Sequence, residues 1–143
     1  MHELQLLGLS LIVTHPERNP LIRAQPQRLL RWVEQGCYVQ ITAQSLLGKW
    51  GDSAKQKAEE WLDQQIVHFF ASDAHNTNKR PLRLKEAYDV VAERWGETVA
   101  QGLFQDNPLA AFEGRDLPYQ PRTEPADGGA AQVRPRRKRF IFF

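Results

Sequence analysis

The chain has 143 residues, of which 41% are hydrophobic and 25% are charged, a balance typical of one soluble globular domain with a modest core. No stretch approaches the roughly 18 consecutive apolar residues of a membrane span, and the first residues do not form the basic and apolar leader of a secretory signal. The single cysteine, Cys37, excludes an internal disulfide, so we expect a protein of the reducing cytoplasm.

The net charge of +2 is unevenly spread along the chain. The segment from Arg134 to Arg139 reads RPRRKR, with five basic groups in six positions, while the rest of the chain is slightly acidic. The basic character therefore predicts no nucleic-acid partner for the domain. The preceding stretch TEPADGGAAQ is small and polar, which favours disorder. We expect a folded domain at 1–121 and a flexible basic tail at 122–143.

The first part of the chain predicts two strands with a helix between them. Residues 2–7 fit the end of a helix, and the apolar, β-branched residues 9–14 fit a buried strand. Prolines between positions 16 and 26 predict a loop. Apolar residues at helical spacing follow, and Gly36 is expected to close that helix before a second strand at 37–42.

The second part of the chain continues the alternation of helices and strands. A loop leads to Ser53, the expected N-cap of a helix at 54–64. Residues 67–72 fit a third strand, and a long helix is expected from about 82 to 95. Two further helical segments are expected near 99–104 and 107–112. This order predicts βαβ units and an α/β fold with a parallel sheet.

Two polar loops directly follow predicted strands, where parallel α/β folds bind ligands. Asp73 and His75 are two residues apart, so on extended backbone both side chains point the same way, as a ligand pair for a divalent metal would. His15 follows another strand and could complete the cluster. Arg18 and Arg80 flank these residues, and guanidinium groups hold phosphate oxygens in bidentate fashion. The combination suggests metal-assisted hydrolysis of a phosphate ester.

Simpler interpretations of these residues stay open from spacing alone. A His-Pro pair such as the one at His15 usually marks a turn, and Asp73 can also cap a turn. Glu17 is expected to pair with a neighbouring arginine on the surface. Cys37 is not the nucleophile of a cysteine-based phosphatase, because that motif needs an arginine six positions later, where Ala43 stands.

Two other residue types are expected to have structural roles. His68 lies inside the third predicted strand and should face a helix or solvent. The four tryptophans, Trp50 among them, are expected to be packing residues rather than a binding platform.

Three segments together resemble one known family: THPERN at 14–19, QITAQSLLGKWG at 40–51 and HFFASDAHNTNKRP at 68–81. The family is that of the bacterial tyrosine phosphatases of capsular and exopolysaccharide biosynthesis, which are built on a polymerase-and-histidinol-phosphatase (PHP) domain. The resemblance runs from about residue 3 to residue 118. It implies the C-terminal part of a PHP-type distorted (β/α)7 barrel, with about three parallel strands and flanking helices.

The resemblance also implies an activity and roles for five residues. The reaction would be metal-dependent hydrolysis of phosphotyrosine in proteins, with a cluster of divalent metals, usually Mn²⁺, and a tyrosine kinase of polysaccharide export as the substrate protein. His15, Asp73 and His75 match metal ligands of the family, and Arg18 and Arg80 match arginines that contact the phosphate.

The chain also departs from the family's pattern. Members open with an Asp-x-His-x-His motif and carry a Pro-His-His segment and a glutamate ligand, and none of these occurs here. We therefore expect a truncated form that hydrolyses phosphate esters poorly or not at all by itself. One alternative is another PHP-type phosphoesterase, although the segment at 40–51 favours the tyrosine phosphatases. Another is a non-catalytic remnant or interaction protein that binds a kinase or, through its basic and aromatic tail, an anionic membrane surface. A merely solubilising tail is the simpler interpretation.

Overall fold

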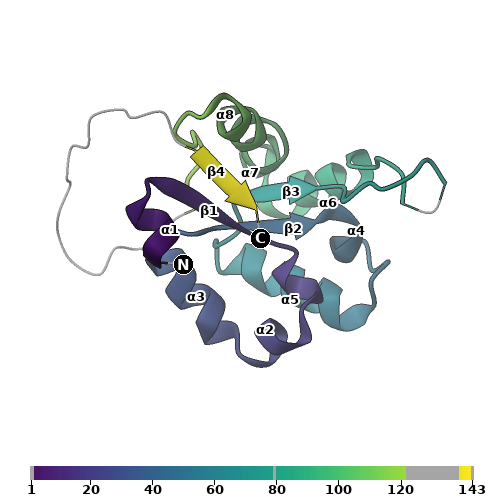
Figure 1. Cartoon of the computed structure of the whole chain (residues 1–143). Helices are drawn as coiled ribbons and strands as arrows, with labels where there is room; N and C mark the ends of the chain where they lie inside the picture. Colours follow the sequence, from purple (N-terminus) through teal and green to yellow (C-terminus); the bar gives the residue numbers. More distant parts are fainter. Residues whose placement is uncertain (1, 79, 122–138, 143) are drawn as a thin grey trace.

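Four parallel strands form a curled sheet, a half-barrel, in the order β3-β2-β1-β4 (Figure 1). The computed structural model describes residues 2–78, 80–121 and 139–142. The strands are β1 (Leu9–Thr14), β2 (Tyr38–Thr42), β3 (Phe69–Ala71) and β4 (Arg139–Phe142). The prediction of three parallel strands is confirmed by β1, β2 and β3, which are neighbours in the sheet.

The register brings the carboxyl ends of the first three strands to one edge of the sheet. Thr14 of β1 lies opposite Gln40 of β2, and Thr42 of β2 lies opposite Ala71 of β3. The backbone N–H of His15 extends the first pairing by donating to the Gln40 carbonyl at 2.9 Å. The loops after β1 and β3 therefore leave the sheet on the same side.

Helices cover one face of the sheet and form the main core with it (Figure 1). Alternate strand residues such as Leu11, Val39 and Ile41 point to this face and are fully buried. Helices that contribute buried side chains to this core are α3 (Pro26–Glu34), α4 (Ala43–Leu46), α5 (Asp52–Asp63), α6 (Lys85–Trp95), α7 (Glu97–Gln101) and the π-helical segment η2 (Gly102–Asp106). Burial of these apolar stripes is the main source of stability for such a layer.

Among the described residues, far fewer side chains cover the opposite face of the sheet. Ile12 and Phe69 pack there against α8 (Asn107–Glu113) and Leu117. Beside them lies an apolar hollow of about 720 Å³ that includes Phe112, a side chain that is 89% exposed. The two faces thus differ: one is a closed core and the other is partly open.

The proline-containing stretch predicted as a loop is largely helical. It holds the 3-10 helix η1 (Pro16–Arg18) and α2 (Pro20–Ala24), and α3 begins at the third proline. Each proline occupies the start of its helix, where its missing N–H costs nothing and its fixed φ suits the first turn. Asn19 caps α2 by accepting hydrogen bonds from two backbone N–H groups. The prolines start helices here instead of preventing them.

Several other predicted boundaries shift by a few residues. The loop after β2 begins with α4 (Ala43–Leu46), and α5 starts at Asp52 after Gly51, so the expected cap at Ser53 is wrong. The short helix at the beginning is α1 (His2–Leu6). Within the described residues, no helix combines the length and apolar character that crossing a membrane requires.

The C-terminal residues differ from the predicted flexible tail. Arg139–Phe142 is a strand in register with β1, so the prediction for 122–143 is wrong for these four residues. These residues pair with β1 because Phe140 and Ile141 point to opposite faces of the sheet and each packs against apolar residues there. Residues 122–138 and 143 lie outside the described residues, and the domain boundary near Pro121 stays a prediction.

Candidate functional site

The candidate site lies where β1 and β3 end. Both chain exits use a left-handed backbone conformation at a residue other than glycine: His15 has φ 38° and Asp73 has φ 53°. Such conformations cost free energy and are held only by surrounding contacts. They turn the backbone sharply out of the sheet, so that Arg18 and Asp73, 55 positions apart, come within hydrogen-bonding distance.

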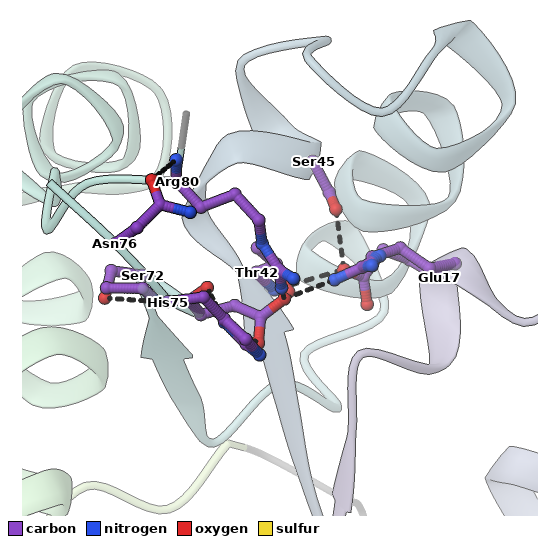
Figure 2. A network of polar contacts seen from close by, with 10 residues as sticks. Glu17, Thr42, Ser45, Ser72, His75, Asn76 and Arg80 are labelled. Carbon is purple, nitrogen blue, oxygen red and sulfur yellow. Dashed lines mark hydrogen bonds and ion pairs between the residues drawn. The ribbon is translucent and has the colours of Figure 1, made fainter. Parts of the chain in front are cut away.

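Glu17, in the loop after β1, is completely buried. Its Oε1 accepts a hydrogen bond from the Ser45 hydroxyl at 2.7 Å and another from the Thr42 backbone N–H at 3.1 Å (Figure 2). The expected surface pairing of this residue is therefore wrong. Burial raises the pKa of the Glu17 carboxyl, and the hydrogen bonds from Ser45 and Thr42 only partly oppose that shift.

The buried carboxylate fixes the loop that carries Arg18. Glu17 connects η1 to the end of β2 and the start of α4, and its own carbonyl accepts a hydrogen bond from Arg23 Nη1 at 2.9 Å. Among the described residues, no group hydrogen-bonds to its buried Oε2. This anchoring role of Glu17 was not predicted from the sequence. The feature that indicates it is the position of Glu17 in a proline-flanked turn directly after a buried strand.

The loop after β3 is exposed and closes on itself. Asn76 Oδ1 accepts a hydrogen bond from the backbone N–H of Arg80 at 2.9 Å (Figure 2). It accepts another from the backbone N–H of Asn78 at 3.1 Å. The His75 N–H donates to the Arg80 carbonyl at 3.0 Å. These local hydrogen bonds return the chain so that Arg80 faces Asp73.

Two arginines converge on one carboxylate at the centre of the site. Arg18 Nη1 lies 2.5 Å from Asp73 Oδ2, and Arg80 Nη2 forms an ion pair with the same oxygen. The side chains of Arg18, Asp73 and Arg80 are 22%, 17% and 29% exposed. Partial burial would raise the pKa of Asp73, but hydrogen bonds and charge from the two arginines outweigh it and lower that pKa. The same two guanidinium groups are suited to phosphate oxygens.

The indole ring of Trp50 packs against both arginines of the site. The Arg18 Cζ lies 3.8 Å from the Trp50 ring centroid, and the Arg80 Cζ lies 5.6 Å away, both within cation–π range. The ring borders open hollows of about 700 and 380 Å³ on the two sides. A packing role was predicted for Trp50 from the sequence. Its position between Gly48 and Gly51 is the sequence feature that indicates a loop, and both glycines have positive φ in the structure.

The three predicted metal ligands are only partly brought together. His75 Nδ1 lies 2.8 Å from the Asp73 carbonyl oxygen and 3.8 Å from Asp73 Oδ1, and the imidazole is 55% exposed. His15 borders the hollow beside Arg18. In 2–78, 80–121 and 139–142, no group of three or more His, Cys, Asp or Glu side chains is arranged to hold a metal ion. Their role as ligands stays a prediction.

Comparison with known proteins gives consistent matches. The family model described as "Capsular polysaccharide synthesis, CpsB/CapC" matches residues 1–113. Tyrosine-protein phosphatase CpsB of Streptococcus pneumoniae is 32% identical over an alignment of 108 residues, and the match covers 72% of this chain and 44% of CpsB. Tyrosine-protein phosphatase YwqE of Bacillus subtilis (strain 168) is 36% identical over an alignment of 108 residues, and the match covers 76% of this chain and 42% of YwqE.

A solved structure matches as well. It is one of the crystal structures of YwqE from Bacillus subtilis and CpsB from Streptococcus pneumoniae, which are called "unique metal-dependent tyrosine phosphatases". The TM-score is 0.76 at 33% identity, and the match covers 86% of this chain and 51% of that one. The chain thus spans about half the length of the relatives that it matches.

Proposed function

Because the chain belongs to the CpsB/CapC family of capsular polysaccharide synthesis, we propose that it forms the phosphate-binding part of a domain that hydrolyses phosphotyrosine in proteins. The relatives are named tyrosine-protein phosphatases, and this chain spans about half of their length. Full activity is accordingly proposed for the domain completed by the remaining half, and phosphate binding for this chain.

The observation that carries this proposal is the convergence of Arg18 and Arg80 on a single oxygen of Asp73. The Asp73 carboxylate is a planar anion held by two guanidinium groups at the carboxyl edge of a parallel sheet. A phosphate monoester presents oxygens of the same charge and hydrogen-bonding character. In the proposed complex the arginines exchange the carboxylate for the phosphate and stabilise its charge during hydrolysis.

The proposal also includes a divalent metal and a protein substrate. We propose His15, Asp73 and His75 as the residues of this chain that bind metal in the completed domain, with Mn²⁺ as the expected ion. A bound metal would supply an activated water. The three residues do not form a complete site by themselves, so no reaction step is assigned to them. The proposed substrate is a phosphotyrosine protein, such as a tyrosine kinase of polysaccharide export in the cytoplasm.

The direct test is binding of inorganic phosphate and of a phosphotyrosine peptide to this chain, measured by calorimetry. Arg18→Ala and Arg80→Ala should each weaken binding about tenfold, which corresponds to about 1.4 kcal/mol for a charged hydrogen-bonding group. Arg31→Ala, on the exposed side of α3, is the matched control and should leave the affinity unchanged. Equal affinities for all variants would contradict the phosphate-binding role.

Turnover of the phosphotyrosine peptide tests the catalytic part. The chain alone should hydrolyse it poorly even with added Mn²⁺, and addition of the unmatched half of YwqE should raise metal-dependent turnover by orders of magnitude. In the completed domain, His75→Ala should abolish turnover and lower metal content, whereas Arg80→Ala should lower turnover with metal content retained. Binding of the peptide without any turnover in the completed domain would favour the alternative, a non-catalytic interaction protein.

A further inference from the structure

The strand β4 joins the sheet from outside the segment that defines the family. The family match ends at residue 113, whereas β4 comprises Arg139–Phe142 and lies beside β1 (Figure 1, yellow). The two strands are parallel and in register, with Leu9 opposite Arg139 and Ile12 opposite Phe142. This strand therefore occupies one edge of the family's sheet with residues that the family match does not include.

The backbone of β1 shows what this edge offers. The His15 N–H points to β2, where it donates to Gln40. Because backbone groups alternate along a strand, the N–H groups of Leu11 and Val13 also face β2, and those of Ser10 and Ile12 face β4. Without β4, the second set would be an open row of donors and acceptors, a template for pairing with another strand.

Side chains of β4 match this edge on both faces of the sheet. Ile141 packs against the helix-covered core, and Phe140 packs beside Ile12 and Phe69 on the opposite face. The Phe140 ring centroid lies 5.8 Å from that of Tyr38. Arg139 and Phe142, at the two ends, are exposed. Two neighbouring apolar residues thus provide most of the attachment of a strand that is only four residues long.

We propose that the outer edge of β1 is a strand-acceptor surface that Arg139–Phe142 occupies, held by Phe140 and Ile141, and that the same strand of a second copy of this chain can take its place. This goes beyond phosphate binding and does not depend on it. It has a consequence for the candidate site, because β1 runs directly into His15 and Arg18. Whatever occupies this edge borders the strand that positions the first arginine.

The test uses amide hydrogen exchange of the full chain, followed by NMR. Ile141→Pro removes a backbone N–H and disfavours strand pairing, and Arg139→Ala is the control in the same strand. Ile141→Pro should lower protection of the Ser10 and Ile12 amides at least about tenfold, while Leu11 and Val13 keep theirs. The control should match the wild-type chain in all four amides.

A synthetic peptide of residues 134–143 then tests the acceptor role. Added to the Ile141→Pro chain, it should restore protection of Ser10 and Ile12, whereas the same peptide carrying Ile141→Pro should not. Dimers of the variant in which these amides stay protected would also support an acceptor edge, filled by a second copy.

Unchanged protection of Ser10 and Ile12 in a monomeric variant, or failure of the peptide to restore it, would overturn the proposal. If all four amides lose protection, the milder Ile141→Ala replaces the proline variant. The same loss of all four amides in Ile141→Ala would show that β4 is an inseparable part of the core, and would overturn exchangeability.

Discussion

The two loops that meet at Asp73 are held in place by different physical means. The loop after β1 is anchored in the interior by Glu17, whose carboxylate is buried against Thr42 and Ser45. The loop after β3 is exposed and depends on the hydrogen bonds of Asn76 within the loop and on ion pairs to Asp73. One arginine of the site is therefore positioned by the core, and the other by contacts that solvent can compete for.

This difference suggests how the site can accept a phosphate. Arg18 starts from a fixed backbone, so its guanidinium loses little freedom when a ligand replaces Asp73. Arg80 belongs to the loop with few buried contacts and can adjust to the ligand. Changing one anchor at a time tests whether the two loops are held by these different contacts.

The largest effect is expected at the buried anchor. Glu17→Ala removes the acceptor of two buried hydrogen bonds and leaves a cavity, which should lower the free energy of unfolding by about 3 kcal/mol. Urea denaturation measures the loss. Glu17→Gln keeps an acceptor oxygen and should lose less than half as much. A change below about 0.5 kcal/mol for Glu17→Ala would mean that the loop is held by other contacts.

A smaller effect is expected at the strand that leads to the exposed loop. Just before β3, His68 is buried, and its Nδ1 accepts a hydrogen bond from the Val39 N–H at 3.2 Å. Burial lowers the pKa of His68 to about 4, against the weaker opposing effect of a backbone hydrogen bond to Ile66. The imidazole therefore stays neutral in the folded chain at a pH where it is protonated in the unfolded chain.

The sign of the pH dependence follows from that lowered pKa. The contribution of neutral His68 to stability is complete above its unfolded pKa and is lost as the pH falls from about 6.5 toward 4. Between pH 7.5 and 5, the wild-type chain should lose about 2 kcal/mol more than His68→Asn, whose amide oxygen can accept the Val39 hydrogen bond. Parallel pH dependences of the two chains would contradict a buried neutral imidazole. The raised pKa of Glu17 acts in the opposite direction in both chains, so the comparison between them isolates His68.

The smallest effect on stability is expected at the exposed contacts. Asp73→Asn should change the free energy of unfolding by less than about 1 kcal/mol, because partly exposed ion pairs contribute little. It should nevertheless raise the affinity for inorganic phosphate several-fold, since both arginines lose a competing anion. Asp89→Asn, which breaks an exposed pair with Lys85, is the control for a general charge effect. A lower phosphate affinity in Asp73→Asn would show that the carboxylate organises the arginines rather than competing for them.

Much of the fold and part of the site could be predicted from local patterns. Short β-branched and aromatic runs indicated β1, β2 and β3, and the polar residues directly after two of them indicated the edge at which Arg18, Asp73 and Arg80 meet. Helix starts at prolines were missed, because a proline is compatible with both a loop and a first helical turn. Trp50 was assigned to packing, because its contacts with Arg18 and Arg80 involve residues about 30 positions away.

Local sequence patterns indicate which segments become strands and which polar residues stand at their ends, since alternation and helical spacing are properties of neighbouring residues. The burial of Glu17 is visible only in the folded chain, because its hydrogen-bonding partners lie 25 and 28 positions away in the sequence. It is likewise only in the folded chain that Arg139–Phe142 pairs with β1 instead of extending into solvent. The physical reason is the same in both cases: local pattern sets the type of an element, whereas its partner depends on which distant surfaces pack together once the chain has closed its loops.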